Sequence, residues 1–347
     1  MVKTFCVLPW YNHEIYDTST TACCLIKGNP DINDVKTALL EGQAHPACNQ
    51  CWQLEQQGQQ SRRQQENTFL DYKIDRDIER IRNDCIEGKN TTLMYQVMTS
   101  NLCNQACVSC NSAFSSRWRD LEPRMDIIPK PLYEIHPERL TIDYAHAKKI
   151  ALLGGEPMFD AKTFEILERL IKAGNTDCFV GFVTNGSIQL NTKQLEVLSK
   201  FSDLNICISI DGIESRFEYM RWPAKWEALL KNIEQYRSVC EVSVSYTISS
   251  LNAIYYNETV AWFNSQNLKF THNVVSTPNW LSLDHAPIEI RERLKDIEFF
   301  NHREFNNPIA LSAMHDYIIA QDRAKRTNLG DYMPKVAEIF NNLKTEL

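Results

Sequence analysis

The chain has 347 residues, 43% of them hydrophobic, which is enough for a large core and suggests one large domain with a smaller one. Its 37 Lys and Arg residues form no long run and are outnumbered by 44 Asp and Glu, giving a formal net charge of −7. Neither nucleic acid nor an anionic membrane is therefore the expected partner. The N-terminus lacks the apolar stretch of a signal peptide, and no run approaches the roughly 18 apolar residues of a membrane span, so we expect a cytoplasmic protein.

Residues 1–66 are rich in cysteine and contain few long apolar runs, and we assign them to a small domain of their own. A charged segment follows, in which Ile74, Ile78 and Ile81 recur at helical spacing. This pattern predicts a connector helix over 67–91.

From residue 92 onward, short β-prone runs alternate with helical stretches. We expect strands at 92–98, 149–153, 178–183, 204–210, 241–248 and 268–275. We expect helices near 112–121, 160–173, 191–200, 226–238 and 252–265. Alternating strands and helices predict an α/β fold with a parallel sheet, and right-handed crossovers would curl the six units into a partial (β/α)6 TIM-like barrel over 92–280. Residues 281–347 show helical patterns and no strand signal, which predicts a C-terminal helical segment.

Polar residues and glycines follow the predicted strands, where barrel sites lie. The cysteine triplet follows the first strand, and Gly154-Gly155-Glu156-Pro157 follows the second. Thr184-Asn185-Gly186 and Ser209-Ile210-Asp211-Gly212 follow the third and fourth. This placement predicts a site at the carboxyl ends of the strands.

Twelve cysteines is a high number for a cytosolic chain, and seven or eight of them fall into two clusters. A reducing compartment disfavours disulfides, so clustered cysteines there more often ligate metal or carry chemistry.

The first cluster is Cys103, Cys107 and Cys110 in the run Cys-Asn-Gln-Ala-Cys-Val-Ser-Cys. Three thiolates from one loop can hold an iron–sulfur cubane and leave one iron open for an amine and a carboxylate of a substrate. Zinc usually needs a fourth ligand, and no His or Cys lies between 111 and 135. A ferredoxin cluster would also need four cysteines.

The Cys-x3-Cys-x2-Cys motif after the first predicted strand resembles the signature of the radical S-adenosylmethionine (SAM) superfamily. The resemblance implies a [4Fe-4S] cluster that passes one electron to SAM, yielding methionine and a 5′-deoxyadenosyl radical that abstracts hydrogen from a substrate. It also implies a one-electron reductant such as flavodoxin or ferredoxin. One residue departs from the family pattern: Ser109 stands before the third cysteine, where an aromatic side chain near the adenine is common.

The run at 154–157 resembles the Gly-Gly-Glu-Pro motif of the same family. Glycine allows a close approach of the backbone to a ligand, which is the role we assign to Gly155. A carboxylate can accept hydrogen bonds from an ammonium group, so we assign Glu156 to the ammonium of SAM. The alternative is a tight turn with a surface glutamate.

Ser209 and Asp211 end the fourth strand on one face, and the resemblance assigns this region to the ribose and the methionine end of SAM. Arg221 lies where related proteins carry an arginine that meets the ligand carboxylate, although a solvent-exposed loop arginine is the alternative. Asn185 is a weaker candidate, since it also suits a turn.

The second cluster lies near the N-terminus. The spacing of Cys48 and Cys51 suits a metal, and Cys6 and the Cys23-Cys24 pair lie at either end of a predicted hairpin. This arrangement resembles the twitch or SPASM-type auxiliary-cluster domains of radical SAM enzymes, here ahead of the barrel. An auxiliary iron–sulfur cluster and a structural zinc both suit four thiolates. Hairpin position favours Cys23 over Cys24 as the ligand.

The sequence thus favours a radical SAM enzyme acting on an unknown substrate, either a peptide or protein or a small molecule. An activase that makes a glycyl radical on a partner protein is a variant of this hypothesis. A zinc-binding interaction module on an α/β scaffold, without catalysis, is the alternative of another class.

Overall fold

The computed structural model describes residues 3–16, 19–56, 58, 60–301 and 303–341. Within them the chain forms an eight-stranded sheet with the order β2-β1-β3-β4-β5-β6-β7-β8. The strands are β1 (Asn12–Tyr16), β2 (Ser19–Thr21), β3 (Met94–Met98), β4 (Lys149–Leu153), β5 (Phe179–Thr184), β6 (Leu204–Ser209), β7 (Glu241–Ile248) and β8 (Lys269–Val274). All run parallel to their neighbours except β2, which is antiparallel to β1. The sheet is open, with β2 and β8 as its edges.

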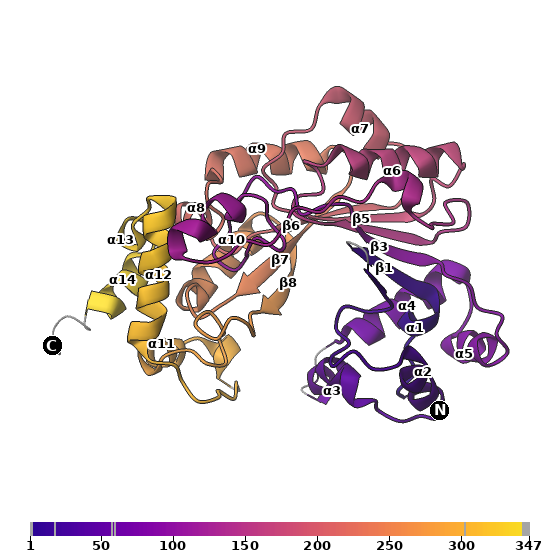
Figure 1. Cartoon of the computed structure of the whole chain (residues 1–347), viewed down its shortest axis with the longest axis horizontal. Helices are drawn as coiled ribbons and strands as arrows, with labels where there is room; N and C mark the ends of the chain where they lie inside the picture. The colour runs from indigo at the N-terminus through magenta and orange to yellow at the C-terminus, as the bar shows by residue number, and fades with distance from the viewer. Residues whose placement is uncertain (1–2, 17–18, 57, 59, 302, 342–347) are drawn as a thin grey trace.

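The α-helices cover one face of this sheet and extend from its two ends (Figure 1). They are α1 (Leu8–Tyr11), α2 (Ile32–Leu40), α3 (Asn49–Gln56), α4 (Arg62–Ile74), α5 (Ile78–Ile86), α6 (Ala161–Lys172), α7 (Thr192–Leu198), α8 (Ser215–Met220), α9 (Trp226–Arg237), α10 (Tyr256–Ser265), α11 (Ile288–Leu294), α12 (Leu311–Lys325), α13 (Leu329–Tyr332) and α14 (Pro334–Asn341). None of the helices that the structure describes has the length and apolar character needed to span a bilayer.

The predicted α/β fold with a partial TIM-like barrel is confirmed, since the six predicted strands correspond to β3 through β8. The strands could be predicted because side chains of opposite burial alternate along them. In β4, Ile150 and Leu152 are buried in the main core, while their neighbours on the other face are partly exposed. Figure 1 shows α6, α7 and α9 on the outer face of the sheet, and the opposite, inner face carries no such layer.

The sheet extends beyond the predicted barrel, because β1 pairs in parallel with β3, with His13 opposite Tyr95. The cysteine-rich segment 1–66 therefore shares a sheet with the barrel segment 92–280. The antiparallel strands β1 and β2 form the hairpin predicted between Cys6 and the Cys23-Cys24 pair. Because the run Asn-His-Glu-Ile-Tyr of β1 has little apolar alternation, its pairing with the barrel sheet was not predicted.

The segment predicted as one connector helix contains the end of α4 and all of α5. Asp75 adopts a left-handed conformation, with φ of 50°, and ends α4. Asp77 then accepts a hydrogen bond from the Arg80 amide and begins α5. One helix-ending signal and one helix-starting signal thus interrupt a charged segment whose apolar spacing alone looks continuous.

The α4 helix packs across the amino ends of the barrel strands. Glu66 forms an ion pair with Lys149 of β4 at 2.7 Å, and Phe69 packs edge-on against Phe179 of β5. Lys73 forms an ion pair with Asp203, which precedes β6. These contacts attach the N-terminal part to the sheet on its inner side.

The segment predicted as a helix near 112–121 forms two short 3₁₀ turns instead, at Trp118–Asp120 and Glu122–Met125. Its serines and asparagines bond to neighbouring loops rather than to a helical ladder. The Ser116 amide donates to the Asn101 carbonyl, and the Ser112 amide donates to the Glu122 carboxylate. The C-terminal segment is helical as predicted, with α11 to α14 in its described part.

Asp160 connects the end of β3 to the start of α6. Its buried carboxylate accepts hydrogen bonds from the hydroxyls of Thr99 and Ser100 at 2.7 and 2.6 Å, and from the Lys162 amide at the helix N-terminus.

Replacing Asp160 with alanine leaves two buried hydroxyls unsatisfied and removes the cap, so we expect the free energy of unfolding to fall by about 3 kcal/mol in urea denaturation. The matched control Asp316→Ala, whose side chain is 84% exposed, should change it by less than about 0.5 kcal/mol. Equal effects would contradict this role.

Candidate functional site

A cavity of about 640 Å³ lies at the carboxyl ends of the strands and is lined by most of the residues predicted from the sequence. These are Cys103, Cys107, Cys110, Gly155, Asn185, Ser209 and Arg221. Two predicted residues, Glu156 and Asp211, are buried behind its wall. The volume lies in the range of ordinary ligand pockets, roughly 300 to 1,000 Å³.

The cysteine loop has no regular secondary structure, yet its backbone is held from several sides. The Trp118 indole donates to the Cys107 carbonyl at 3.0 Å, and the Ser116 hydroxyl lies 3.0 Å from both the Cys103 amide and the Cys103 carbonyl. The Ala106 amide donates to the Trp222 carbonyl at 2.7 Å. The loop is therefore a fixed structure that presents its thiols to the cavity.

Burial makes the three thiols difficult to ionise without a metal. Desolvation and the nearby Cys107 thiolate together raise the pKa of Cys103 to about 12. Burial also raises the pKa values of Cys107 and Cys110. Since a metal ligand must be deprotonated, a bound cationic group would compensate this cost and release protons.

Two glycines allow the 154–157 motif to lie against the cysteine loop. The Gly155 amide donates to the Ser100 carbonyl at 3.0 Å, and the Glu156 amide donates to the Leu102 carbonyl at 2.7 Å. A Cβ atom at Gly155 would lie 2.2 Å from the Leu102 oxygen, which is sterically impossible. Gly154 has a φ of 148°, a conformation that favours glycine.

Glu156 is occupied within the protein. Its carboxylate is 1% exposed and accepts hydrogen bonds from the Thr184 hydroxyl at 2.6 Å, the Asn185 amide at 2.7 Å and the Met158 amide at 3.0 Å. Burial raises the pKa of this carboxyl group, and the three donors oppose the shift. The geometry gives Glu156 the role of joining the motif to the end of β5, and its contact with a ligand ammonium stays a prediction.

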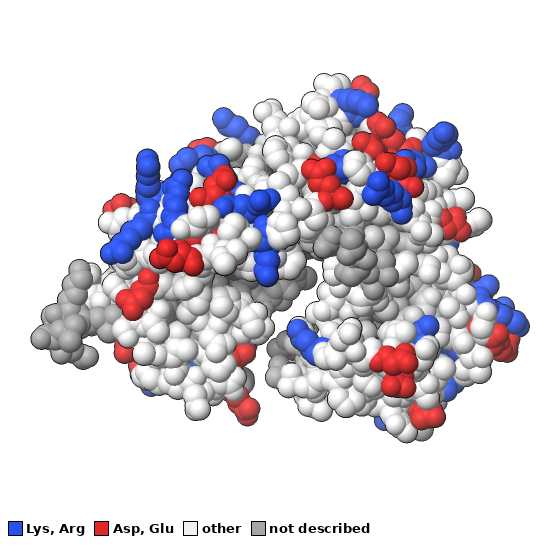
Figure 2. Space-filling model, in the orientation of Figure 1, with Lys and Arg blue, Asp and Glu red and all other residues white. Residues whose placement is uncertain are grey.

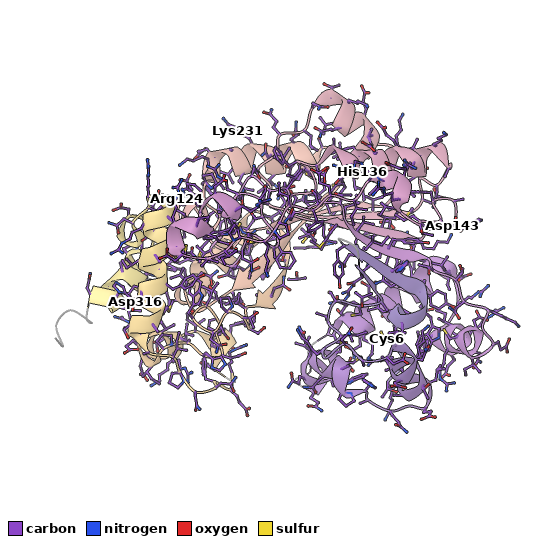
Figure 3. All side chains as sticks on the ribbon, in the orientation of Figure 1. Cys6, Arg124, His136, Asp143, Lys231 and Asp316 are labelled. Carbon is purple, nitrogen blue, oxygen red and sulfur yellow. The ribbon has the colours of Figure 1, made fainter. Side chains whose placement is uncertain are left out.

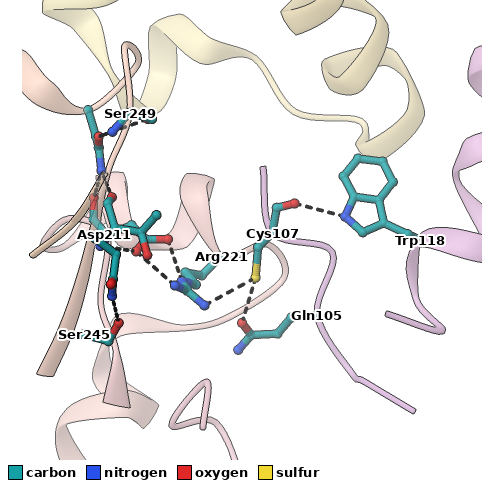
Figure 4. A network of polar contacts seen from close by, with 10 residues as sticks. Gln105, Cys107, Trp118, Asp211, Arg221, Ser245 and Ser249 are labelled. Atoms are coloured by element: carbon teal, nitrogen blue, oxygen red, sulfur yellow. Dashed lines mark hydrogen bonds and ion pairs between the residues drawn. The ribbon is translucent and has the colours of Figure 1, made fainter. Parts of the chain in front are cut away.

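Arg221 is buried rather than solvent-exposed, and Asp211 holds it in place (Figure 4). Arg221 Nε lies 2.7 Å from Asp211 Oδ2, and Nη2 donates to Oδ1 at 2.9 Å. Its Nη1 lies 3.8 Å from Cys107 Sγ. The guanidinium therefore faces both the cavity and a thiol, while Asp211 stays behind it and neutralises its charge.

Asn185 and Ser209 line the cavity as predicted. Asn185 Nδ2 donates to Asn104 Oδ1 at 2.9 Å and lies 3.8 Å from Cys103 Sγ. Ser209 ends β6 on the inner face of the sheet.

Other residues of the cavity carry no sequence signal. Phe114, Pro278, Trp280 and Tyr317 form an apolar wall, in which the rings of Trp280 and Tyr317 stack at 4.1 Å. This wall joins a loop after β8 to α12, and only tertiary contact brings the two together. Gln105 is 1% exposed, and its Nε2 has no hydrogen-bond partner among the described residues.

Four N-terminal cysteines line a second, closed and apolar cavity of about 20 Å³. They are Cys6, Cys23, Cys48 and Cys51. Cys24 instead is exposed, and Arg62 Nη1 lies 2.9 Å from its sulfur. Burial raises the pKa of Cys48 to about 11. Burial and the repulsion of the other three thiolates both raise the pKa of Cys6. The structure thus brings together the four cysteines that the sequence predicted.

Side chains of α4 hold the Cys6 loop against this cavity. The Asn67 side chain donates to the Phe5 carbonyl at 2.8 Å and accepts from the Val7 amide at 2.9 Å. Arg63 also donates to the Phe5 carbonyl, at 2.8 Å, and pairs with Glu55 on the helix that carries Cys51. No short-range pattern predicts this network, since it connects segments about sixty residues apart.

The donors of the first cavity fit an iron–sulfur cluster and a polar ligand. Its three thiols are free, and a buried amide nitrogen without a partner and a guanidinium lie beside them. Within the described residues no three His, Cys, Asp or Glu side chains are arranged to hold a single metal ion. Figure 3 shows Cys6 in the N-terminal part, and Arg124 beside the C-terminal helices at the other end of the molecule.

Comparison with known proteins matches part of the chain to one family model. The family model of the Radical SAM superfamily matches residues 97–260. No curated protein sequence matches the chain. A solved structure of anSMEcpe with bound AdoMet shares 16% identity at a TM-score of 0.43, and the match covers 62% of this chain and 63% of that one, less than two thirds of its length.

A second distant likeness is to Streptococcus suis SuiB bound to its precursor peptide SuiA, at 12% identity and a TM-score of 0.42. It covers 84% of this chain and 69% of that one. At such identities and scores, neither structure says anything about the chemistry of this chain.

Replacing Gly155 with alanine should displace the cysteine loop, because the new Cβ would meet the Leu102 carbonyl. After anaerobic reconstitution, we expect the variant to bind less iron than the wild-type protein, because the displaced thiols no longer converge on the first cavity. The matched control Gly330→Ala, with its nearest neighbouring atom at 3.3 Å, should keep its iron. Full iron content in both variants would show that the close contact is not needed.

The second cavity yields a paired prediction. Cys23→Ala removes a thiol from the four-cysteine set, so it should release the metal of that centre, whereas Cys24→Ala should retain it. Elemental analysis for iron and zinc measures both. The reverse result would assign the ligand to Cys24.

Proposed function

We propose that this protein, whose residues 97–260 match the family model of the Radical SAM superfamily, is an enzyme that reductively cleaves SAM. The observation that carries this proposal is the convergence of three free thiols on one cavity at the carboxyl ends of parallel strands. Cys103, Cys107 and Cys110 would hold a [4Fe-4S] cluster with one open iron. That cluster supplies one electron to the sulfonium of SAM, and the resulting 5′-deoxyadenosyl radical takes hydrogen from the substrate.

The surrounding residues position the ligand and exclude water. Arg221 faces the cavity and can donate to a ligand carboxylate, while Asp211 fixes its orientation. The Asn185 side chain and the Ser209 hydroxyl offer hydrogen bonds from two neighbouring strands. The apolar wall around Trp280 and Tyr317 supplies a flat surface on the other side.

The substrate surface is the inner face of the sheet, which continues from the cavity. Ser209 lines the cavity, so alternation places Cys207 and Asn205 on the same face. Their neighbours on β7 include Ser243 and Ser245, and Ser243 donates to Asn205 at 3.0 Å. Figure 2 shows the molecule hollowed on this side, between the N-terminal part and the C-terminal helices. Hydroxyls and amides without net charge suit a polar substrate, such as a peptide backbone or a polar small molecule.

The N-terminal cysteines form the second centre of the proposal, an auxiliary iron–sulfur cluster. Four thiols, three of them buried, supply a complete ligand set, and α4 joins this centre to the sheet on its inner side. Zinc in this centre is the competing outcome. A cytoplasmic one-electron reductant such as flavodoxin or ferredoxin would supply electrons.

Anaerobic reconstitution tests the whole proposal. We expect about eight irons per chain and release of 5′-deoxyadenosine from SAM when a chemical reductant is added. Alanine at Cys103, Cys107 or Cys110 should abolish this release, because each replacement removes a cluster ligand. Replacing Cys48 or Cys51 should remove about half of the iron and spare SAM cleavage.

Cys240→Ala is the matched control, since Cys240 lies beside β7 and lines neither thiol cavity. It should keep both iron and cleavage. A colourless zinc protein without SAM cleavage would favour a zinc-binding interaction module instead.

A further inference from the structure

The α12 helix places a buried cation against the outer side of the cysteine loop. Lys325 is 5% exposed, and its Nζ lies 4.6 Å from the centroid of the Trp118 ring. It donates to Gln321 Oε1 at 2.8 Å, and Gln321 in turn donates to the Val108 carbonyl at 3.3 Å. Trp118 donates to the Cys107 carbonyl. Both neighbours of the ammonium thus bind the backbone of the loop that carries the thiols.

Among the described residues, this ammonium has no carboxylate partner, and it contacts an amide oxygen and an aromatic ring. Asp322, one turn away on α12, uses its carboxylate for the Thr327 hydroxyl at 2.6 Å and the Leu329 amide at 2.8 Å. Burying a cation without a counter-charge is costly, so a negative group is expected nearby.

The negative groups that act on this ammonium include two thiolates of the cysteine set. Burial lowers the pKa of Lys325 to about 7, and the Cys107 and Cys110 thiolates, together with Asp322, act against this shift. Arg221, the other buried cation here, differs because Asp211 already neutralises it. Of these two cations, only Lys325 adds a net positive charge to the surroundings of the thiols.

We propose that Lys325 is the counter-charge of the cluster held by Cys103, Cys107 and Cys110, and that it makes this cluster easier to reduce. The inference rests on the proposed function. Reduction adds one negative charge to the cluster, and a fixed positive charge in a medium of low dielectric stabilises the reduced form more than the oxidised form. Helix α12 would therefore help to set the reduction potential of a centre that lies more than two hundred residues away in the chain.

The experiment is a redox titration of the reconstituted full-length protein, followed by electron paramagnetic resonance. The relevant cluster is identified as the one whose signal changes when SAM is added. Lys325→Met should lower the ratio of reduced to oxidised cluster about tenfold at a fixed potential near the wild-type midpoint, which is 59 mV for one electron. Lys325→Arg keeps the charge and should stay near wild type.

Lys295→Met is the matched control, because Lys295 is 65% exposed and should leave the ratio unchanged. Lys325→Gln provides a second neutral variant with a polar side chain in case Met prevents folding. An unchanged ratio in a folded, iron-loaded neutral variant would overturn the role of Lys325 alone. If wild type shows no SAM-sensitive cluster signal, the proposed function itself fails.

Discussion

The contact between Gly155 and the carbonyl of Leu102 is the constraint on which the site depends. It brings the turn after β4 against the start of the cysteine loop, at a distance that no side chain permits. Hydrogen bonds from the Gly155 and Glu156 amides then fix the two segments together. Because Glu156 also binds the end of β5, one short motif connects three consecutive strand ends and sets the position of the thiols relative to the sheet.

Charge compensation is the second requirement of the site. Thiolates, a guanidinium and an ammonium all lie in surroundings of low polarity, where each would be costly alone. Asp211 balances Arg221 directly, at 2.7 Å, and leaves its remaining donors for Cys107 and the cavity. Lys325 has no such partner in the described chain, so its charge is available to a cluster. The protein thus combines a neutral pair, in which Asp211 positions Arg221, with the net positive charge of Lys325.

The barrel and its thiols were predictable because their signals are local. Strands β4 and β7 alternate in burial, and the three cysteines lie within eight residues of one loop. Other parts depend on contacts between distant segments. The strand β1 gains its place by pairing with β3, and the exact orientation of Glu156 follows from donors on β5. The chemistry of that carboxylate suggested a ligand contact, which stays a prediction. Its buried position and its three hydrogen-bond donors within the protein could not be predicted from the sequence.

The same reasoning explains why the C-terminal helices carried no functional signal in the sequence. In the sequence, Lys325 is a lysine near the end of a predicted helical segment, with no motif around it. Only the fold brings its side chain beside Trp118, which binds the Cys107 carbonyl. Arg124, which follows the cysteine loop, then binds the carbonyl of Ala324 and holds the helix in place. One side of the loop faces the cavity and the other is covered by α12. Displacing that helix would admit water to the thiols and remove the unpaired Lys325 cation together, so α12 belongs to the structure that surrounds the thiols.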